Sequence, residues 1–249
     1  AAYQARDYVV ANLSWIVPVA IFGVVLVVGL WLLLTWLSSR GRFMFLHCVA
    51  TNRGEAKVPW NKYARQANSL FVFRLVMHVI GFFGVVCPII FFTLLILGMV
   101  SAGHAAVGGI VGGVLIFLAI ILVGTCLAIV GLFTDDFVEP IMMLRMTSCT
   151  AAWGEFIDVL RANKGRLFIY VLFKIVIGMA IGVVMMLIIC ATCCCAACIL
   201  SIPYIGTVLL LPVLVFQRSY PLYYLQQYGP QYDVFASEEQ PEQETLGYV

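Results

Sequence analysis

The chain has 249 residues, of which 63% are hydrophobic and only 10% are charged. In a water-soluble domain about a quarter of the residues are charged. A folded chain of this size exposes much of its surface to the solvent, so it could not keep this many apolar residues away from water. The composition therefore excludes an ordinary soluble protein and predicts a protein embedded in lipid. The net charge of +2 is too small to indicate a nucleic-acid partner.

Long apolar stretches predict about five membrane-embedded helices, because a spanning helix needs about 20 mostly apolar residues. The stretch 167–216 is long enough for two such helices, with a break near Pro203, since proline lacks the amide donor of a helix. The last helix, 202–217, would be short and contains Pro212, so we expect it to tilt, kink or be partly re-entrant. The predicted fold is an all-α, polytopic transmembrane helical bundle. Its other spans are residues 9–37, 70–100 and 105–133.

The basic residues lie in two of the four connections between the spans. The connection after the first span contains six lysines and arginines against Glu55 alone, and the connection after the third contains four basic residues. The short connections at 101–104 and near Ser201 contain none. By the positive-inside rule the two long connections face the cytoplasm, which places the N-terminus outside and the C-terminus inside. The first span, 9–37, is too long for a typical signal-peptide core, so we interpret it as part of the structure.

Two halves of the chain share an order of motifs. In each, a span is followed by Trp-x-x-aromatic, an asparagine and Leu-Phe-x-aromatic, beginning at Trp60 in one half and at Trp153 in the other. A parallel repeat of 9–100 and 105–200 would explain this, as would the ordinary preference of aromatic residues for membrane interfaces. Both long connections are expected to contain an interfacial amphipathic helix, clearest in 153–160 and weaker in 42–49. Residues 1–235 are predicted to form one membrane domain, and the acidic tail 236–249 to be mobile.

Arg74 and Lys174 follow the Leu-Phe-x-aromatic motifs and lie just inside the inner ends of their spans. Ionisable residues at this depth are paired or functional, although a long side chain can also reach back to the headgroups. Neither span supplies a carboxylate. We therefore expect both residues to bind anionic lipid headgroups rather than a substrate, with help from the interfacial Trp60 and Trp153.

The cysteine run 190–198 contains two C-x-x-C spacings but is embedded in an apolar helix. Tetrahedral metal sites usually need a loop between such pairs, so we expect no metal. Small residues favour close helix contacts in a bilayer, which leads us to interpret Cys190, Cys194 and Cys198 as one packing stripe. Lipidation, a disulfide or a metal are the alternatives. Gly108 and Gly112 are expected to have the same packing role.

Other polar residues have structural explanations. The three histidines are scattered, and His78, inside a span, is expected to be packed or hydrogen-bonded rather than a haem ligand. The acidic residues Asp135, Asp136 and Glu139 could form a cation site. They are explained more simply as the membrane exit of the third span and the start of the next amphipathic stretch. No cofactor is predicted.

Several segments together resemble an uncharacterised family of polytopic bacterial inner-membrane proteins, a domain of unknown function. They are residues 203–213, Phe216-x-Arg218-x-Tyr220, Tyr228-Gly229-Pro230-x-Tyr232-Asp233, the cysteine run, Trp60 and Asn68-Ser69-Leu70-Phe71. The resemblance extends from Arg40 to Phe235. It implies a bacterial inner-membrane location and brings no reaction, substrate or site residues.

The expected function is that of a non-enzymatic membrane scaffold or accessory subunit, which binds lipids and a partner membrane protein or a second copy of itself. The alternative is a transporter or lipid-handling protein, favoured by the possible repeat, by Arg74 and Lys174, and by prolines that could break helices near a site. A membrane enzyme is the weakest hypothesis. No constellation of nucleophile, base or metal is visible in the sequence.

Overall fold

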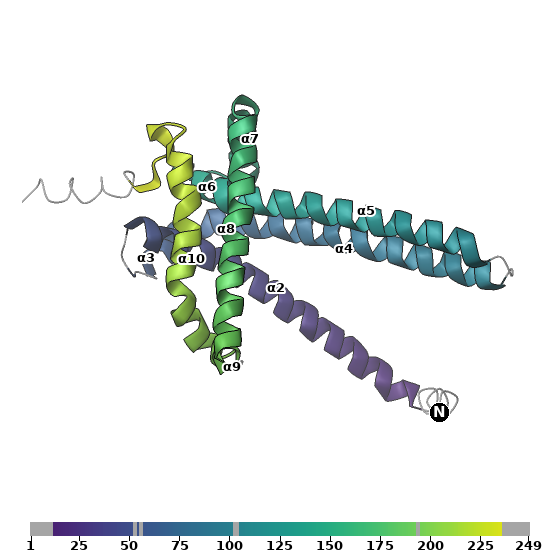
Figure 1. Ribbon diagram of the computed structural model, residues 1–249. Helices are drawn as coiled ribbons and strands as arrows, with labels where there is room; N and C mark the ends of the chain where they lie inside the picture. The colour runs from purple at the N-terminus through teal and green to yellow at the C-terminus, as the bar shows by residue number, and fades with distance from the viewer. Residues whose placement is uncertain (1–11, 52–53, 55–56, 102–104, 193–194, 236–249) are drawn as a thin grey trace, which may run out of the picture.

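The computed structural model of the protein describes residues 12–51, 54, 57–101, 105–192 and 195–235 (Figure 1). Within these residues all regular structure is helical. The elements are α2 (Leu13–Thr51), α3 (Lys57–Lys62), α4 (Ala64–Ser101), α5 (Ala105–Phe133), the π-helical turn η1 (Thr134–Val138), α6 (Glu139–Arg145), α7 (Cys149–Ala162), α8 (Lys164–Ala191), α9 (Cys195–Leu200), α10 (Pro203–Gln226) and the 3₁₀ turn η2 (Pro230–Tyr232). The all-α prediction is confirmed.

Five helical segments of the described chain are long and apolar enough to cross a membrane. They are Ser14–Thr51, Ala64–Gly98, Val111–Arg145, Lys164–Ala191 and Tyr204–Gln226. The predicted break before Pro203 is confirmed, because α10 begins at that residue. The prediction of a short fifth span is wrong: α10 has 24 residues and continues through Pro212 and Pro221. Proline lacks an N–H donor but is tolerated in an apolar helix when other groups satisfy the freed carbonyl.

The spans meet at one end and diverge at the other. Figure 1 shows three bodies that leave a common junction: α2 alone, the antiparallel pair α4 and α5, and α8 with α10. The buried core of the described chain lies at this junction, where Phe137 stacks on Phe156 at 5.2 Å between ring centroids and meets Tyr170 edge-on at 4.9 Å. Away from the junction the apolar side chains are mostly exposed, as expected of surfaces that face lipid.

The two predicted amphipathic stretches have different outcomes. The stretch 42–49 does not form a separate helix but extends α2, and its residues Phe43 and Leu46 are buried in the core. The stretch 153–160 does form a helix, α7. Its apolar face packs on the protein core through Phe156 and Ala152, because the aromatic residues of η1 and α8 offer a closer apolar partner than the headgroup layer.

Helices α4 and α5 approach each other closely where glycine occurs. A Cβ atom built on Gly113 would lie 3.0 Å from Phe92 Cζ, and one on Gly84 would lie 2.8 Å from Val123 Cγ1. A Cβ atom built on Gly112 would lie 3.4 Å from Phe92 Cε2, so this glycine also faces α4. Gly108 lies in α5, and the packing role predicted for it stays a prediction.

The element order is similar in the two halves: a long helix, a short helix and a second long helix. α2, α3 and α4 correspond in this order to α5 with its extension, α7 and α8. The repeat itself stays a prediction. The tail 236–249 lies outside the described residues.

Candidate functional site

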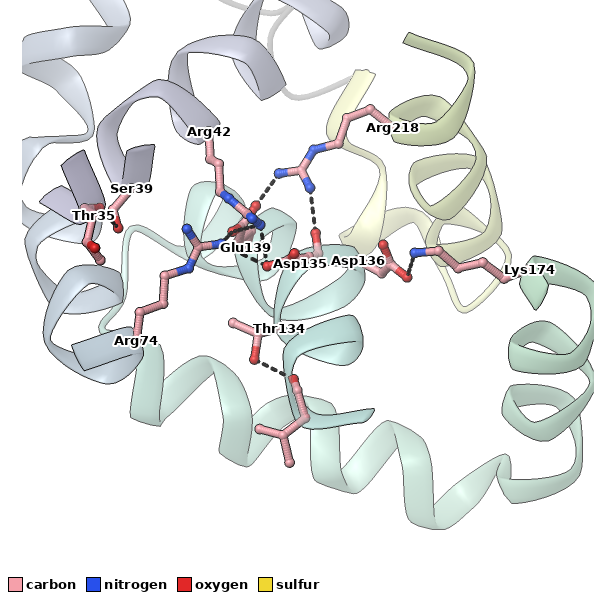
Figure 2. A network of polar contacts seen from close by, with 11 residues as sticks. Thr35, Ser39, Arg42, Arg74, Thr134, Asp135, Asp136, Glu139, Lys174 and Arg218 are labelled. Carbon is pink, nitrogen blue, oxygen red and sulfur yellow. Dashed lines mark hydrogen bonds and ion pairs between the residues drawn. The ribbon is translucent and has the colours of Figure 1, made fainter. Parts of the chain in front are cut away.

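Seven charged side chains meet at the junction of the five spans, and we refer to them as the ion cluster (Figure 2). The basic members come from four different helices and the acidic members from one short segment after α5. They are Arg42 of α2, Arg74 of α4, Lys174 of α8 and Arg218 of α10, with Asp135 and Asp136 of η1 and Glu139 of α6. Every long span therefore contributes to the cluster directly or, for α5, through its continuation.

The π-helical turn places the acidic residues. Glu139 donates its backbone N–H to the Thr134 carbonyl, five residues back, which is the hydrogen-bond pattern of a π-helix. The next donor in this pattern would be residue 140, which would reach the Asp135 carbonyl, but Pro140 has no N–H. That carbonyl instead accepts a hydrogen bond from Arg218 Nη1 at 2.7 Å. A proline just after the turn, in the first turn of α6, thus leaves an acceptor for an arginine from another span.

Asp135 and Glu139 face the arginines. Arg74 Nη2 lies 2.9 Å from Asp135 Oδ1 and 3.1 Å from Glu139 Oε1. Arg42 pairs with the same two carboxylates, at 3.2 Å from Glu139, and Arg218 pairs with Glu139 Oε2. The Glu139 side chain is only 1% exposed. Burying an unpaired carboxylate is energetically unfavourable. Three guanidinium groups compensate the negative charge of Glu139.

Asp136 points to the other side of the helix and binds α8. Its Oδ2 accepts a hydrogen bond from Tyr170 Oη at 2.9 Å and pairs with Lys174 Nζ. Tyr170 stacks on Tyr220 of α10, and Tyr224 of α10 donates to the Arg166 carbonyl at 2.8 Å. These contacts join α8 and α10 to the segment that follows α5.

The prediction that Arg74 and Lys174 bind lipid headgroups assumed that neither has a carboxylate partner, and this assumption is wrong. Both were expected to lack a carboxylate, but each is paired, and they bind different carboxylates. The partners come from the segment after the third span, whose acidic residues the sequence alone explained as a helix start. The sequence signal that points to them is the occurrence of four basic and three acidic residues near the ends of apolar spans, since such charges pair with one another.

The two tryptophans lie apart from the ion cluster. Trp60 meets Trp36 of α2 edge-on at 6.0 Å, and the Arg40 guanidinium lies over both rings at 4.8 and 4.6 Å. Trp153 packs between Phe73 of α4 and Phe156. Each tryptophan therefore holds a short helix against a span.

The remaining predicted residues are not brought together. α8 ends at Ala191 and α9 begins at Cys195, so the cysteine run does not form the single-helix stripe that was predicted. Cys190 and Cys198 are exposed with free thiols, and Cys194 lies outside the described residues. Among the residues that the structure describes, no group of His, Cys, Asp and Glu is arranged to hold a metal ion. His78 contacts the Arg74 carbonyl through Nδ1 at 2.7 Å and packs edge-on against Trp31, as predicted for a packed histidine.

A cysteine not predicted from the sequence lies beside the cluster. Cys149, the first residue of α7, is buried, and its backbone N–H donates to Ser69 Oγ of α4 at 3.0 Å. Burial, reinforced by the nearby Glu139 carboxylate, raises the pKa of the Cys149 thiol to about 12. The thiol therefore stays protonated at neutral pH and is a packing group rather than a nucleophile.

A cavity of about 1270 Å³ lies between α2, α4 and α5 and reaches the ion cluster. Arg42, Arg74 and Asp135 line its polar end. Its walls are mainly apolar, with Trp31, Leu34, Phe82, Phe83, Val85 and Leu127 among the lining residues. The cavity is thus polar at the junction and apolar along the spans.

Comparison with known proteins relates the chain to one family. The family of unknown function DUF7544 matches residues 3–211. No curated protein and no solved structure matches the chain. The match covers the first four spans and the beginning of α10, and the chain therefore belongs to the DUF7544 family.

Proposed function

We propose that this protein is a non-enzymatic membrane scaffold or accessory subunit, which binds lipids and holds a partner membrane protein or a second copy of itself. The proposal rests on one observation: the five spans are joined at one end and separate from one another toward the other end. The ion cluster joins all five spans at one end, while the apolar flanks beyond it stay exposed. In this proposal the paired charges serve to hold the helix ends in register.

Helix α8 has a surface suited to a partner helix. Gly178 and Gly182 are one turn apart, and a Cβ atom added to either would meet nothing within 4 Å. A Gly-x-x-x-Gly pair permits close helix approach in a bilayer, where small residues and van der Waals packing drive association. Nearby, Met179 and Val183 are 59% exposed. This side of α8 therefore offers a flat, apolar contact surface.

The partner contact is tested with the double variant Gly178→Leu/Gly182→Leu. The full chain is extracted in mild detergent, and the mass of its complexes is measured by native mass spectrometry. We expect wild-type protein in a complex of fixed stoichiometry and the double variant mostly as single chains, because leucine separates the helix backbones. Ala180→Leu, on another side of α8, is the matched control and should keep the complex. Wild-type protein found only as single chains with lipid would contradict the proposal.

We further propose that the protein lies in the bacterial inner membrane, with its N-terminus outside and its C-terminus in the cytoplasm. The basic residues of the long connections support this orientation. In this orientation the cytoplasmic ends of all five spans lie at the junction. Five crossings place the two termini on opposite sides of the membrane, as the orientation requires.

The cavity favours a second candidate function, in which the protein transports or handles lipid. It joins charged residues to an apolar wall, as a site for an amphipathic substrate would. Reconstitution into liposomes tests this candidate: movement of a fluorescent anionic lipid between leaflets should be faster with the protein than without it. An unchanged rate would leave the scaffold as the function.

A further inference from the structure

The polar end of the cavity between α2, α4 and α5 has more positive than negative charge. The side chains of Arg42 and Arg74 line it together with one carboxylate, that of Asp135. In the cluster as a whole, the three arginines share Asp135 and Glu139, while Lys174 and Asp136 balance each other. The cluster as a whole therefore has one more positive than negative charge, and two of its three arginines line the cavity.

The two arginines also have unused donors. Among the described residues, the ion pairs of Arg42 are made through Nη1 and those of Arg74 through Nη2. A guanidinium has five N–H donors in a planar fork that suits a carboxylate or phosphate. The Arg42 side chain is 34% exposed and that of Arg74 is 14% exposed. An anion in the cavity could therefore bind both groups without displacing Asp135.

The length of the cavity matches one leaflet of a membrane. Its lining residues on α4 extend from Phe73 to Val85 and those on α2 from Arg42 back to Trp31. At 1.5 Å per residue, these distances are about 16–18 Å along the helix axis. The hydrocarbon core of a bilayer is about 30 Å thick, so one leaflet measures about 15 Å. The apolar wall therefore has the length of an acyl chain that begins at the arginines.

We propose that this cavity binds one anionic phospholipid. Its phosphate lies against Arg42 and Arg74, and an acyl chain follows Trp31 and Phe83 along the spans. The phosphate offsets the surplus charge of the cluster, and the lipid fills the space between α2 and the α4–α5 pair. This site deepens the proposed function, which requires lipid binding, and it excludes Lys174, which does not line the cavity.

The proposal is tested by lipid titration of the purified, delipidated full chain, followed by native mass spectrometry. The probes are phosphatidylglycerol, phosphatidylcholine with the same acyl chains, and inorganic phosphate. We expect phosphatidylglycerol to bind about tenfold more tightly than phosphatidylcholine. Both lipids present a phosphate to the arginines, but the choline cation of phosphatidylcholine cancels the charge of its phosphate and is repelled by the surplus positive charge of the cluster. The double variant Arg42→Gln/Arg74→Gln should lose this preference. Arg145→Gln, outside the cavity, should keep it.

A second pair of variants leaves the ion cluster intact. Ala128 lines the cavity on α5, so Ala128→Trp should narrow the apolar part of the cavity and weaken phosphatidylglycerol binding about tenfold. Ala119→Trp, exposed on the same helix outside the cavity, should bind as the wild type does. Equal affinity for both lipids, an unchanged affinity in Ala128→Trp, or inorganic phosphate that competes as well as the lipid would each overturn the site. Because the partner contact on α8 is measured separately, loss of the lipid site would leave the scaffold proposal standing.

Discussion

At the scale of single residues, the electrostatics of the ion cluster depend most on the carboxylate of Glu139. Glu139 is fully buried and pairs with arginines from three spans. Buried ion pairs seldom add net stability over apolar packing, but removing one partner leaves the others uncompensated at a cost of about 3–5 kcal/mol. The cluster therefore determines which helix ends meet, and it adds little to the total stability of the fold.

The variant Glu139→Gln should accordingly lower the free energy of unfolding by about 3 kcal/mol. Glu155→Gln is its matched control, because Glu155 pairs at 3.1 Å with the exposed Arg145 and is itself partly exposed. Ion pairs near the surface contribute less than about 1 kcal/mol. The measurement is the unfolding midpoint in mixed detergent micelles, followed by circular dichroism. Equal shifts for the two variants would show that the cluster is not the electrostatic centre of the junction.

At the scale of elements, the spans could be predicted and their pairing could not. Hydropathy is a local sum over some 20 residues, so five apolar helices follow from composition along the chain. The ion cluster depends instead on which helix ends meet, and on a π-helical turn with Pro140 that frees the Asp135 carbonyl. Lys174 and Asp136 are 38 positions apart, and no local pattern joins them. The end of α8 at Ala191 was missed because the cysteine run is as apolar as the helix before it.

The α4–α5 pair gives a prediction at this scale. Gly113→Val should destabilise the pair by about 1–3 kcal/mol, because even its Cβ atom would lie 3.0 Å from the Phe92 ring and overpacking displaces its neighbours. Gly124→Val on the same helix meets nothing within 4 Å and controls for the general effect of replacing a helical glycine. Unfolding in mixed micelles measures both variants. A Gly124→Val variant as unstable as Gly113→Val would argue against a packed α4–α5 interface.

At the scale of the whole molecule, the orientation can be tested with two positions. Lys57 belongs to a long basic connection and Glu242 to the acidic tail, and we expect both in the cytoplasm because basic connections stay on that side. Single cysteines at these positions, in a cysteine-free background, should resist a membrane-impermeant maleimide in intact cells and react after lysis. A single cysteine at position 103 should react in intact cells. Positions 57 and 242 found on opposite sides would refute the orientation.

The long separation of the cluster's members along the chain also sets an order for its synthesis. Arg74 precedes its partner Glu139 by 65 positions, and Glu139 precedes Arg218 by another 79. At about 5–20 residues per second, the ribosome needs roughly 3–13 s to supply the first carboxylates. During this interval none of the carboxylates of the cluster exists to pair with Arg42 and Arg74. We therefore expect the first two spans to reach their final position only after Arg218 of the last helix has been made.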